Sequence, residues 1–591
     1  HDIKMGINIR ANQMNVGTEG FQDGYWVIDG VYTSGGYANA GNPIADFMQG
    51  MSGLAIHDQT FPSDSQYNGG PVTGRRWKIY RPYVQDDWRV TKNLTLNLGL
   101  AWDLTTPISE EAWRQANLVA STGQLQIAGE PGINGAAGIQ MNWTAFEPRI
   151  GGAWKVMGSD KTVFRAGYGA FHDSAWSMGA QGLWQNPPFF AESDAFGASA
   201  APFCPFATSY CAATLGQPAT AINISDGFQL FPTRPNPSTF TGALLSEPTN
   251  FKLGYVQQYN ANLQRELPGQ VLLTVGYAGS KGRHILIYGN DLNTDSPSAC
   301  VPGSGYTLGC LPNGAPYTAF PSSYPYAFNT IYCVCDSGQT LYNSLQIKAE
   351  TKSSRNGLYA LISYTYSRTY DNGLSDGLGS VLSAPYFPLP NWSKLDWGLS
   401  QINLNNNFVA SVIYDLPFGK GKKWGSNWNG VTNSLLGGWQ ATVIEKITSG
   451  FPVPLIDSNN ASGTYFQNGN GDNYNRPDYV AGCNAGAGNH SALLWINPSC
   501  FPAPAPGQLG NANRVPATGP DFVNTDFSVI KTFALPWENM GLNFRAEFFN
   551  LWNHAQFGMP VNDINAGSAF GYVNSTVNNP RLVQFALKLT F

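Results

Sequence analysis

Eight cysteines are the residues of this sequence whose spacing most plainly predicts covalent chemistry. They form four close pairs: Cys204 with Cys211, Cys300 with Cys310, Cys333 with Cys335, and Cys483 with Cys500. An even number of cysteines in exposed loops of an exported protein predicts disulfides, and bridging within each pair is expected. Because Cys333 and Cys335 would close a small, strained ring, pairing with a cysteine of another loop stays open.

The histidines give no pattern of metal ligands. They are scattered along the chain and do not recur at ligand spacing: His1, His57, His172, His284, His490 and His554. No cysteine pair has histidine partners at zinc-finger spacing, so neither a metal site nor a cofactor is expected. The stretch 468–473 is similar to an oxygen-rich calcium loop, but it lacks the closing glutamate of an EF-hand, and a polar loop is favoured.

Acid–base and nucleophilic catalysis are not indicated either. Asp86 and Asp87 are adjacent, and in an extended strand their side chains point to opposite sides and do not converge. The sequence contains no Walker loop, no Gly-x-Ser-x-Gly elbow and no His-Glu-x-x-His motif. We therefore predict no enzymatic activity.

The elements that carry these residues follow a period of two. At the end of the chain, Val583, Phe585, Leu587, Leu589 and Phe591 alternate with Gln584, Ala586, Lys588 and Thr590. Segments 93–103 and 541–548 alternate in the same way. This period indicates strands with one apolar and one wet face. The apolar face would meet a second sheet in a soluble sandwich, or lipid in an outer-membrane barrel whose charged face lines the lumen.

The connections between strands favour the barrel. We pair strand 78–90 with 93–104, 144–156 with 161–172, 251–266 with 270–285, 341–352 with 356–370, 402–416 with 435–450, and 521–534 with 540–553. Links within pairs are short, apart from a longer one near 418–423, and links between pairs are long. Short turns on one side and long loops on the other are typical of bacterial outer-membrane barrels. The external loops are expected at about 105–143, 173–250, 286–340, 371–401, 451–520 and 554–580, and they contain all eight cysteines.

Composition agrees with a wall between lipid and water. Charged residues make up 12% of the chain and aromatic residues 13%, and there are 66 glycines. No apolar run reaches the length of about 20 residues that a spanning helix needs, so any membrane span must consist of strands. The net charge of -5 argues against a nucleic-acid partner.

The predicted fold is an all-β, antiparallel transmembrane barrel. Three weaker strands at 2–12, roughly 22–33 and roughly 50–60 bring the total to about 16, and an even number is typical of this class. Aromatic residues near strand ends suit interfacial girdles, although the preference of aromatics for strands would give the same distribution. These residues are Trp88, Trp102, Trp154, Trp439, Phe549 and Trp552.

Several motifs, in order along nearly the whole chain, resemble the C-terminal barrel of Oar-like TonB-dependent receptors. They lie at 45–50, 83–99, 147–151, 164–169, 277–282, 342–346, 363–367, 416–421, 437–440, 449–452 and 545–554. Two examples are Tyr83-Val-Gln-Asp-Asp-Trp-Arg89 and Arg545-Ala-Glu-Phe-Phe-Asn-Leu-Trp-Asn-His554. The resemblance implies a barrel of about 22 strands, an N-terminal plug inside it, and energy from the inner-membrane TonB complex.

The start of the chain departs from this pattern. We identify no plug, no TonB-contacting segment and no regulatory-like domain, and the strand count is about six short of such a barrel. We therefore expect 1–591 to be barrel domain, with the N-terminal part of the protein outside this chain. A naturally split or smaller barrel is the alternative.

The resemblance also implies a function, namely uptake of an unidentified oligosaccharide, peptide or chelate across the cell outer membrane, with the loops extracellular. The implied partners are the TonB complex, acting through a plug not present in this chain, outer-membrane lipid, and a surface lipoprotein. Two alternatives remain open. A passive porin-like channel would need a charged constriction, and a surface adhesin or structural barrel would use the large loops without transport.

Overall fold

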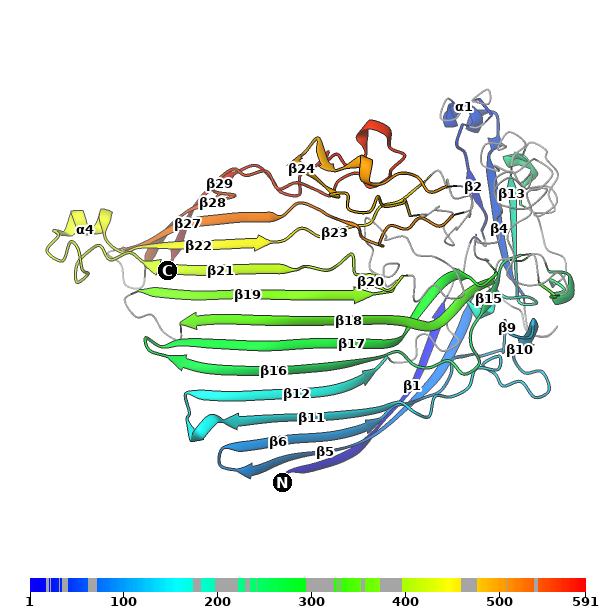
Figure 1. The fold of residues 1–591 in the computed structure, drawn as a ribbon, viewed down its shortest axis with the longest axis horizontal. Coiled ribbons are helices and arrows are strands. Elements are labelled where there is room, and N and C mark those ends of the chain that lie inside the picture. Colours follow the sequence, from blue (N-terminus) through cyan, green and yellow to red (C-terminus); the bar gives the residue numbers. More distant parts are fainter. Residues whose placement is uncertain are drawn as a thin grey trace.

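The computed structural model describes most of the chain. The described residues are 1–16, 21, 23–30, 32–33, 41–61, 72–173, 182–196, 222–228, 234–240, 242–293, 324–326, 329, 331–351, 357–372, 396–458, 476–505, 508–535 and 540–591. They form one large sheet of long strands that lie side by side, with several small sheets gathered at one end of it (Figure 1).

The large sheet contains 18 strands within the described residues. The long ones are β1 (Ile3–Val16), β5 (Thr73–Thr91), β6 (Leu94–Trp102), β11 (Phe146–Lys155), β12 (Thr162–His172), β16 (Tyr255–Leu267), β17 (Val271–Asp291), β18 (Ile331–Thr351), β19 (Leu358–Asp371), β21 (Asn406–Asp415), β22 (Trp439–Thr448), β27 (Phe522–Ala534), β28 (Gly541–Phe549) and β29 (Leu582–Thr590). The other four are short: β7 (Leu104–Thr105), β8 (Ser109–Glu110), β15 (Leu244–Ser246) and β20 (Gly398–Leu399).

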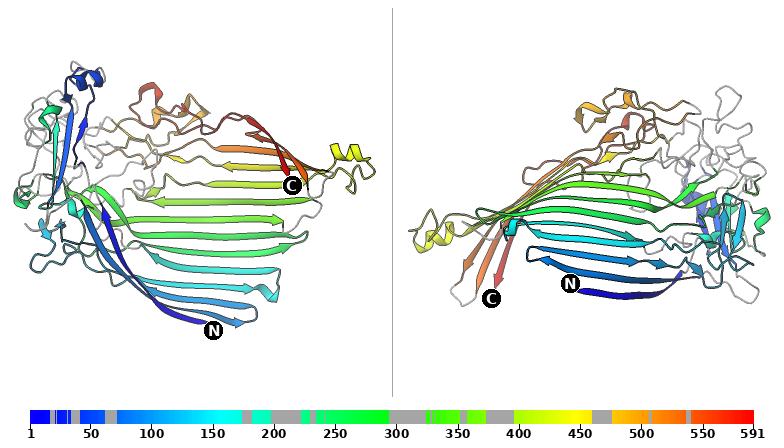
Figure 2. Two further views of the ribbon diagram at one scale, coloured as in Figure 1. Left: turned by 180° about the vertical axis from the view of Figure 1, so that it is seen from behind. Right: turned by 60° about the horizontal axis from the view of Figure 1, so that its bottom comes forward.

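Each long strand pairs antiparallel with the long strands that precede and follow it in the chain. The exceptions are β1 and β29, whose outer edges have no partner within the described part of the chain. The sheet therefore curves as an open wall with two edges and does not close (Figure 2). Side chains on these edge strands are strongly exposed, with Met5 at 74% and Phe585 at 68%.

The register joins apolar residues of all the long strands into one face. Ile150 of β11 lies opposite Leu98 of β6 and Tyr168 of β12, and Phe544 of β28 lies opposite Leu587 of β29. We call this face the apolar belt; from β1 to β29 it includes Ile7, Val84, Leu98, Ile150, Tyr168, Leu263, Val275, Leu345, Tyr364, Phe408, Val443, Phe527, Phe544 and Leu587. Large apolar side chains are exposed here, as contact with lipid requires.

Short links and both termini lie at one end of the sheet, which we call the turn end (Figure 1). The link between β16 and β17 is a tight turn, and Gly269 in it has a φ of 86°, a conformation that glycine adopts without strain. The 3-10 helix η1 (Val156–Gly158) lies between β11 and β12. The helix α4 (Gly430–Leu436) lies in the longer link between β21 and β22 and projects beyond the strands.

The opposite end, which we call the loop end, holds the small sheets and most short helices. The small sheets are β2 (Tyr25–Val27), β4 (Leu54–Thr60) and β13 (Phe190–Phe196); β3 (Met51–Ser52) and β14 (Ile222–Asn223); β9 (Ala116–Val119) and β10 (Gln124–Ile127); β23 (Pro452–Val453) and β26 (Ala517–Thr518); and β24 (Gly486–Ser491) and β25 (Leu494–Ile496). The helices are α1 (Pro43–Met48), η2 (Leu183–Gln185), η3 (Ile224–Asp226), η4 (Pro237–Thr239), η7 (Pro498–Cys500) and η8 (Gly567–Ala569).

Three apolar cores stabilise the loop end. The first includes Ile139, Leu183, Phe251 and Val334, each at most 1% exposed. The second includes Val453, Leu455, Ile496, Cys500 and Phe570, each at most 3% exposed. The third is formed by Leu118, Leu244, Tyr326 and Ile331. The long connections are thus packed structures, because segments outside the membrane must bury their own apolar residues to become ordered.

The antiparallel architecture, the period of two and all six strand pairs are confirmed. The expected strands at roughly 22–33 and 50–60 do not join the wall; they form β2, β3 and β4, which pair with each other, with β13 and with β14. Periodicity identifies a strand but not the sheet that it enters. In β4, Ala55 and Asp58 point to opposite sides of the strand and are both buried within the loop end.

One further difference concerns the longest hairpin. β17 and β18 continue past the other strands into the segment 286–340, because their ends pack into the loop-end core: Ile287 is 5% exposed and Val334 is fully buried.

The two faces can be distinguished by substitution of neighbouring residues on β18. Leu345 lies on the apolar belt and is 42% exposed, whereas Gln346 points to the other face. We expect Leu345→Arg to lower the free energy of unfolding in phospholipid vesicles by about 2–4 kcal/mol, because lipid does not solvate the guanidinium. Gln346→Arg is the matched control and should change it far less. Denaturant titration followed by tryptophan fluorescence measures both, and equal losses would contradict the assignment of faces.

Candidate functional site

Behind the apolar belt, the alternate side chains of the same strands form a continuous polar face. Arg149 of β11 lies opposite Gly99 and Gly169, and Lys348 of β18 lies opposite Thr274 and Ser363. Because successive residues of a strand point to opposite sides, the residues between belt positions all belong to this face. It is the largest charged and amide-rich surface that the wall presents, and it is the candidate functional site.

Glu147 organises the charges of three strands on this face. Its carboxylate is 1% exposed and pairs with the guanidinium groups of Arg81 on β5 and of Arg149, the latter at 3.1 Å. It also accepts a hydrogen bond of 2.9 Å from the backbone N–H of His172 on β12. The buried carboxylate of Asp103, at the end of β6, also acts on Arg81, so the two guanidinium groups are balanced locally, and Arg149 remains 45% exposed toward the space in front of the face.

Elsewhere on the polar face, opposite charges and amides pair locally. Lys348 and Glu350 are 2.8 Å apart, and Arg545 and Glu547 are 3.4 Å apart. Arg165 donates a hydrogen bond of 2.8 Å to Gln264. The cationic groups of Lys348 and Arg545 are each 47% exposed, so they stay hydrated. Such a surface of mixed sign can bind polar solutes through hydrogen bonds without retaining them by strong charge.

Two buried ion pairs fix loops that are distant in sequence. Arg476 pairs with Asp396, and Arg514 pairs with Asp371, with each side chain at most 4% exposed. Burial, with the neighbouring Arg514, lowers the pKa of Arg476 to about 10 against the opposing effect of Asp396. Asp371 lies opposite Thr340, so Arg514 is attached on the polar-face side of β19. A loop arrangement that separated either pair would leave a buried charge without its partner. These ion pairs therefore favour one arrangement of the loops over the others.

A third buried pair lies at the loop end of β5. Glu110 and Arg114 are 2.6 Å apart and at most 3% exposed, and Glu110 also accepts hydrogen bonds from the backbone N–H groups of Gly74 and Ala112 at 2.9 and 2.7 Å. Burial alone would raise the pKa of the Glu110 carboxyl, but Arg114 and the backbone donors outweigh it and hold this pKa below its ordinary value.

The structure contains two of the four cysteine pairs as disulfides. Cys483 is joined to Cys500, with a Cα–Cα distance of 5.5 Å, and Cys333 is joined to Cys335, with a Cα–Cα distance of 5.3 Å. The second of these lies within β18 and not in a loop, because β18 begins at Ile331. Cys204, Cys211, Cys300 and Cys310 lie outside the described residues, and their pairing stays a prediction.

The other residues weighed for chemistry are not brought together. Asp86 and Asp87 lie on opposite faces: the Asp86 carboxylate is 2.7 Å from Nδ1 of His1, and that of Asp87 accepts a hydrogen bond of 2.5 Å from Asn97. Among the described residues, no three His, Cys, Asp or Glu side chains are grouped as metal ligands. The stretch 468–473 lies outside the described residues.

Five of the six predicted aromatic residues lie at the two levels expected of girdles, whereas Phe549 lies opposite Leu582 on the polar-face side. Trp88, Trp154 and Trp439 are near the turn end, and Trp102 and Trp552 are near the loop end. Trp439 lies opposite Lys531 and packs edge-on against Phe544, with ring centroids 6.1 Å apart. No helix among the described residues is long and apolar enough to cross a membrane.

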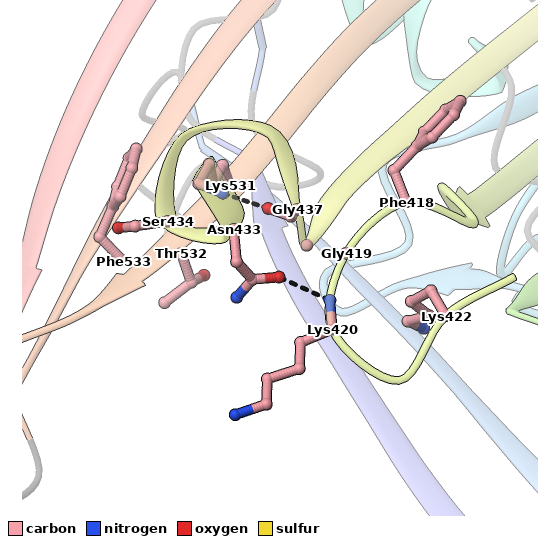
Figure 3. A pocket seen from close by; sticks show the side chains of 11 residues that line it. Phe418, Gly419, Lys420, Lys422, Asn433, Ser434, Gly437, Lys531, Thr532 and Phe533 are labelled. Carbon is pink, nitrogen blue, oxygen red and sulfur yellow. Dashed lines mark hydrogen bonds between the residues drawn. The ribbon is translucent and has the colours of Figure 1, made fainter. Parts of the chain in front are cut away.

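Sequence reasoning missed a cavity at the turn end, of about 320 Å³ (Figure 3). It lies between the link 416–438 and the end of β27 and is lined by Phe418, Gly419, Lys420, Lys422, Asn433, Ser434, Gly437, Gly438, Lys531, Thr532 and Phe533. The only signal in the sequence was the unusual length of this link, together with its lysines at 420, 422 and 423.

Comparison with known proteins gives a family match over nearly the whole chain. Residues 1–584 match the family model described as an outer membrane beta barrel domain. No curated protein matches the sequence.

Solved structures with a similar arrangement include three receptors and transporters. The siderophore receptor PirA from Acinetobacter baumannii is 9% identical with a TM-score of 0.39, and the match covers 92% of this chain and 52% of that one. The outer membrane transporter YddB from Escherichia coli is 10% identical with a TM-score of 0.38, and the match covers 91% of this chain and 59% of that one. The pyoverdine outer membrane receptor FpvA from Pseudomonas aeruginosa is 8% identical with a TM-score of 0.37, and the match covers 90% of this chain and 48% of that one. The chain spans about half of the length of these proteins.

The Glu110–Arg114 pair predicts a pH dependence. Because folding lowers the pKa of Glu110 below the ordinary 4.5, its carboxylate stabilises the loop end above that pH, and this contribution is lost as the pH falls through the folded-state pKa. Glu110→Gln should cost about 3–5 kcal/mol at neutral pH by leaving Arg114 buried without its carboxylate, and the difference from wild type should shrink in acid. Protease protection of the loop end between pH 7 and pH 3 measures this.

The neighbouring carboxylate provides the control. Glu111 pairs with Arg76 but is 38% exposed, so Glu111→Gln should change protection little at any of these pH values. A loss with Glu111→Gln as large as that with Glu110→Gln would contradict the buried-pair explanation.

Proposed function

Because the chain belongs to the family of outer membrane β-barrel domains, we propose that it forms the barrel of a TonB-dependent transporter, in which the polar face lines the route of an imported solute. The observation that carries this proposal is the unbroken polar face behind the apolar belt. Hydrocarbon covers one side of the wall, and the other side is charged, hydrated and continuous from the loop end to the turn end.

The solute class follows from the charges on this face. The exposed groups of Arg149, Lys348 and Arg545 are each accompanied by a carboxylate nearby, so the face offers hydrogen bonds of both kinds and little net charge. This favours a polar solute such as an oligosaccharide, a peptide or a chelate over a simple ion. The ordered loop end would provide the outer binding surface, since its segments are fixed by the pairs of Arg476 and Arg514.

Energy and gating require groups beyond this wall. In the proposal, the TonB complex acts through a plug outside this wall, and a surface lipoprotein is a further candidate partner. Capture occurs at the loop end, and release follows at the turn end when the plug rearranges.

Uptake by cells tests the proposal directly. Cells that produce or lack the protein are given defined mixtures of oligosaccharides, peptides and ferric chelates, and depletion of each compound from the medium is measured with and without TonB. We expect one class to be depleted only when both the protein and TonB are present. Depletion that needs the protein but not TonB would indicate a passive channel, and no depletion with binding at the cell surface would indicate an adhesin; either result would contradict the proposal.

A substitution on the polar face links the route to this surface. Arg149→Gln removes an exposed cation, while Arg81 continues to pair with Glu147, and we expect uptake to fall several-fold at low solute concentration. Arg265→Gln is the control, because Arg265 lies opposite Leu273 on the apolar-belt side, and uptake should not change. An unchanged rate with Arg149→Gln would separate the route from this part of the face.

A further inference from the structure

The turn-end cavity contains a buried cation on the lipid side of the wall. Lys531 of β27 lies opposite Trp439 and Phe544, both of which belong to the apolar-belt side, and it is only 4% exposed. Its Nζ donates a hydrogen bond to the carbonyl of Gly437. An ammonium has three donors, so this contact leaves capacity for an oxygen ligand in the cavity (Figure 3).

The walls of the cavity combine positive charge with apolar surface. Lys420 and Lys422 line the cavity together with Lys531, and none of the lining residues is acidic. The rings of Trp439 and Phe533 lie 5.5 and 5.0 Å from the Lys531 ammonium. At about 30 Å³ per water in the liquid, the space equals about ten waters, more than a phosphate group fills.

Helix α4 divides its residues between the cavity and the surroundings. Asn433 and Ser434 line the cavity, and Asn433 accepts a hydrogen bond of 2.6 Å from the backbone N–H of Lys420. Val431 and Leu435 are one turn apart, lie across the helix from Asn433, and are 72% and 59% exposed. The helix is held on the belt side of the wall, since Trp439 Nε1 donates to the Leu435 carbonyl at 3.0 Å.

A second aromatic group extends this surface. Trp424 is 50% exposed, its ring centroid lies 5.3 Å from that of Phe418, and the Lys423 ammonium is 4.9 Å from it. Tryptophan beside lysine, with exposed leucine and valine next to them, is the composition of segments that lie in a membrane interface.

From these observations we propose that the cavity binds the phosphate headgroup of an anionic phospholipid of the periplasmic leaflet. The phosphate oxygens occupy the space between Lys531, Lys420 and Lys422, and the acyl chains extend along the apolar belt, which continues from the cavity through Phe544 and Leu587. A lipid is favoured over a soluble anion because Lys531, α4 and Trp439 all lie on the side of the wall that faces hydrocarbon. The proposal depends on the outer-membrane location alone and not on transport.

Lipid retention by the purified full chain tests this site. The protein is reconstituted in vesicles of phosphatidylcholine with and without added phosphatidylglycerol, extracted in mild detergent, and its bound lipid is weighed by native mass spectrometry. We expect phosphatidylglycerol to be retained selectively. Lys420→Gln and Lys422→Gln should each weaken this retention about five-fold, the equivalent of about 1 kcal/mol per lysine.

Lys420 and Lys422 are at the surface, so their substitution tests the site without disturbing the fold. Lys531→Gln removes the buried positive charge and should abolish the preference. Lys588→Gln is the matched control: Lys588 lies opposite Asn543 on the polar face of the same end, and retention should not change. Equal retention of both lipids, an equal loss with Lys588→Gln, or displacement of the lipid by inorganic phosphate would each overturn the proposal.

Discussion

Hydrocarbon offers no hydrogen-bonding partner, and this single constraint shapes the wall. Every backbone N–H and C=O group that crosses the membrane must be paired inside the protein. Among the described residues, the antiparallel ladder from β1 to β29 pairs each long strand on both sides, apart from the two edges and a few register shifts such as those between β17 and β18. Polar side chains on the apolar belt meet the same requirement. Asn343 lies opposite Gly279, and its Oδ1 accepts hydrogen bonds from the hydroxyls of Tyr259 and Tyr277 at 2.9 and 2.5 Å. The alternation of apolar and polar residues then places lipid on one side and water on the other.

Outside the membrane, water satisfies exposed backbone groups, and order has to come from other interactions. The loop end gains it from three apolar cores, the Cys483–Cys500 disulfide and buried ion pairs such as Arg514–Asp371. Buried pairs contribute little net stability, because desolvation offsets their attraction, but they penalise every arrangement in which one partner is left alone. A binding surface made from long connections benefits from this selectivity, since loose segments would lose conformational entropy when they bind.

Almost all strands of the wall can be predicted from the sequence, because each strand has a local period of two and each short link has turn residues. Segment 93–103 could therefore be assigned from its leucines alone, and its partner from proximity along the chain. Contacts between distant segments leave no such period. The pairing of β4 with β13, the bond between Arg476 and Asp396, and the placement of α4 over Lys531 all join residues far apart in the chain. In the sequence, the pattern of β4 predicts a strand but not its partner, and Arg476, Asp396 and the residues of α4 have the composition of ordinary loops.

The chain directions of the two edge strands restrict how the wall can close into a barrel. β1 runs from the turn end to the loop end, whereas β29 runs from the loop end to the turn end, so the two edge strands run in opposite directions. Direct closure of one rim on the other would be antiparallel. Any strands inserted between them would preserve that relation only as complete hairpins, that is, in even numbers. An odd insertion would force one parallel seam into a ladder that is antiparallel at all its other long joins.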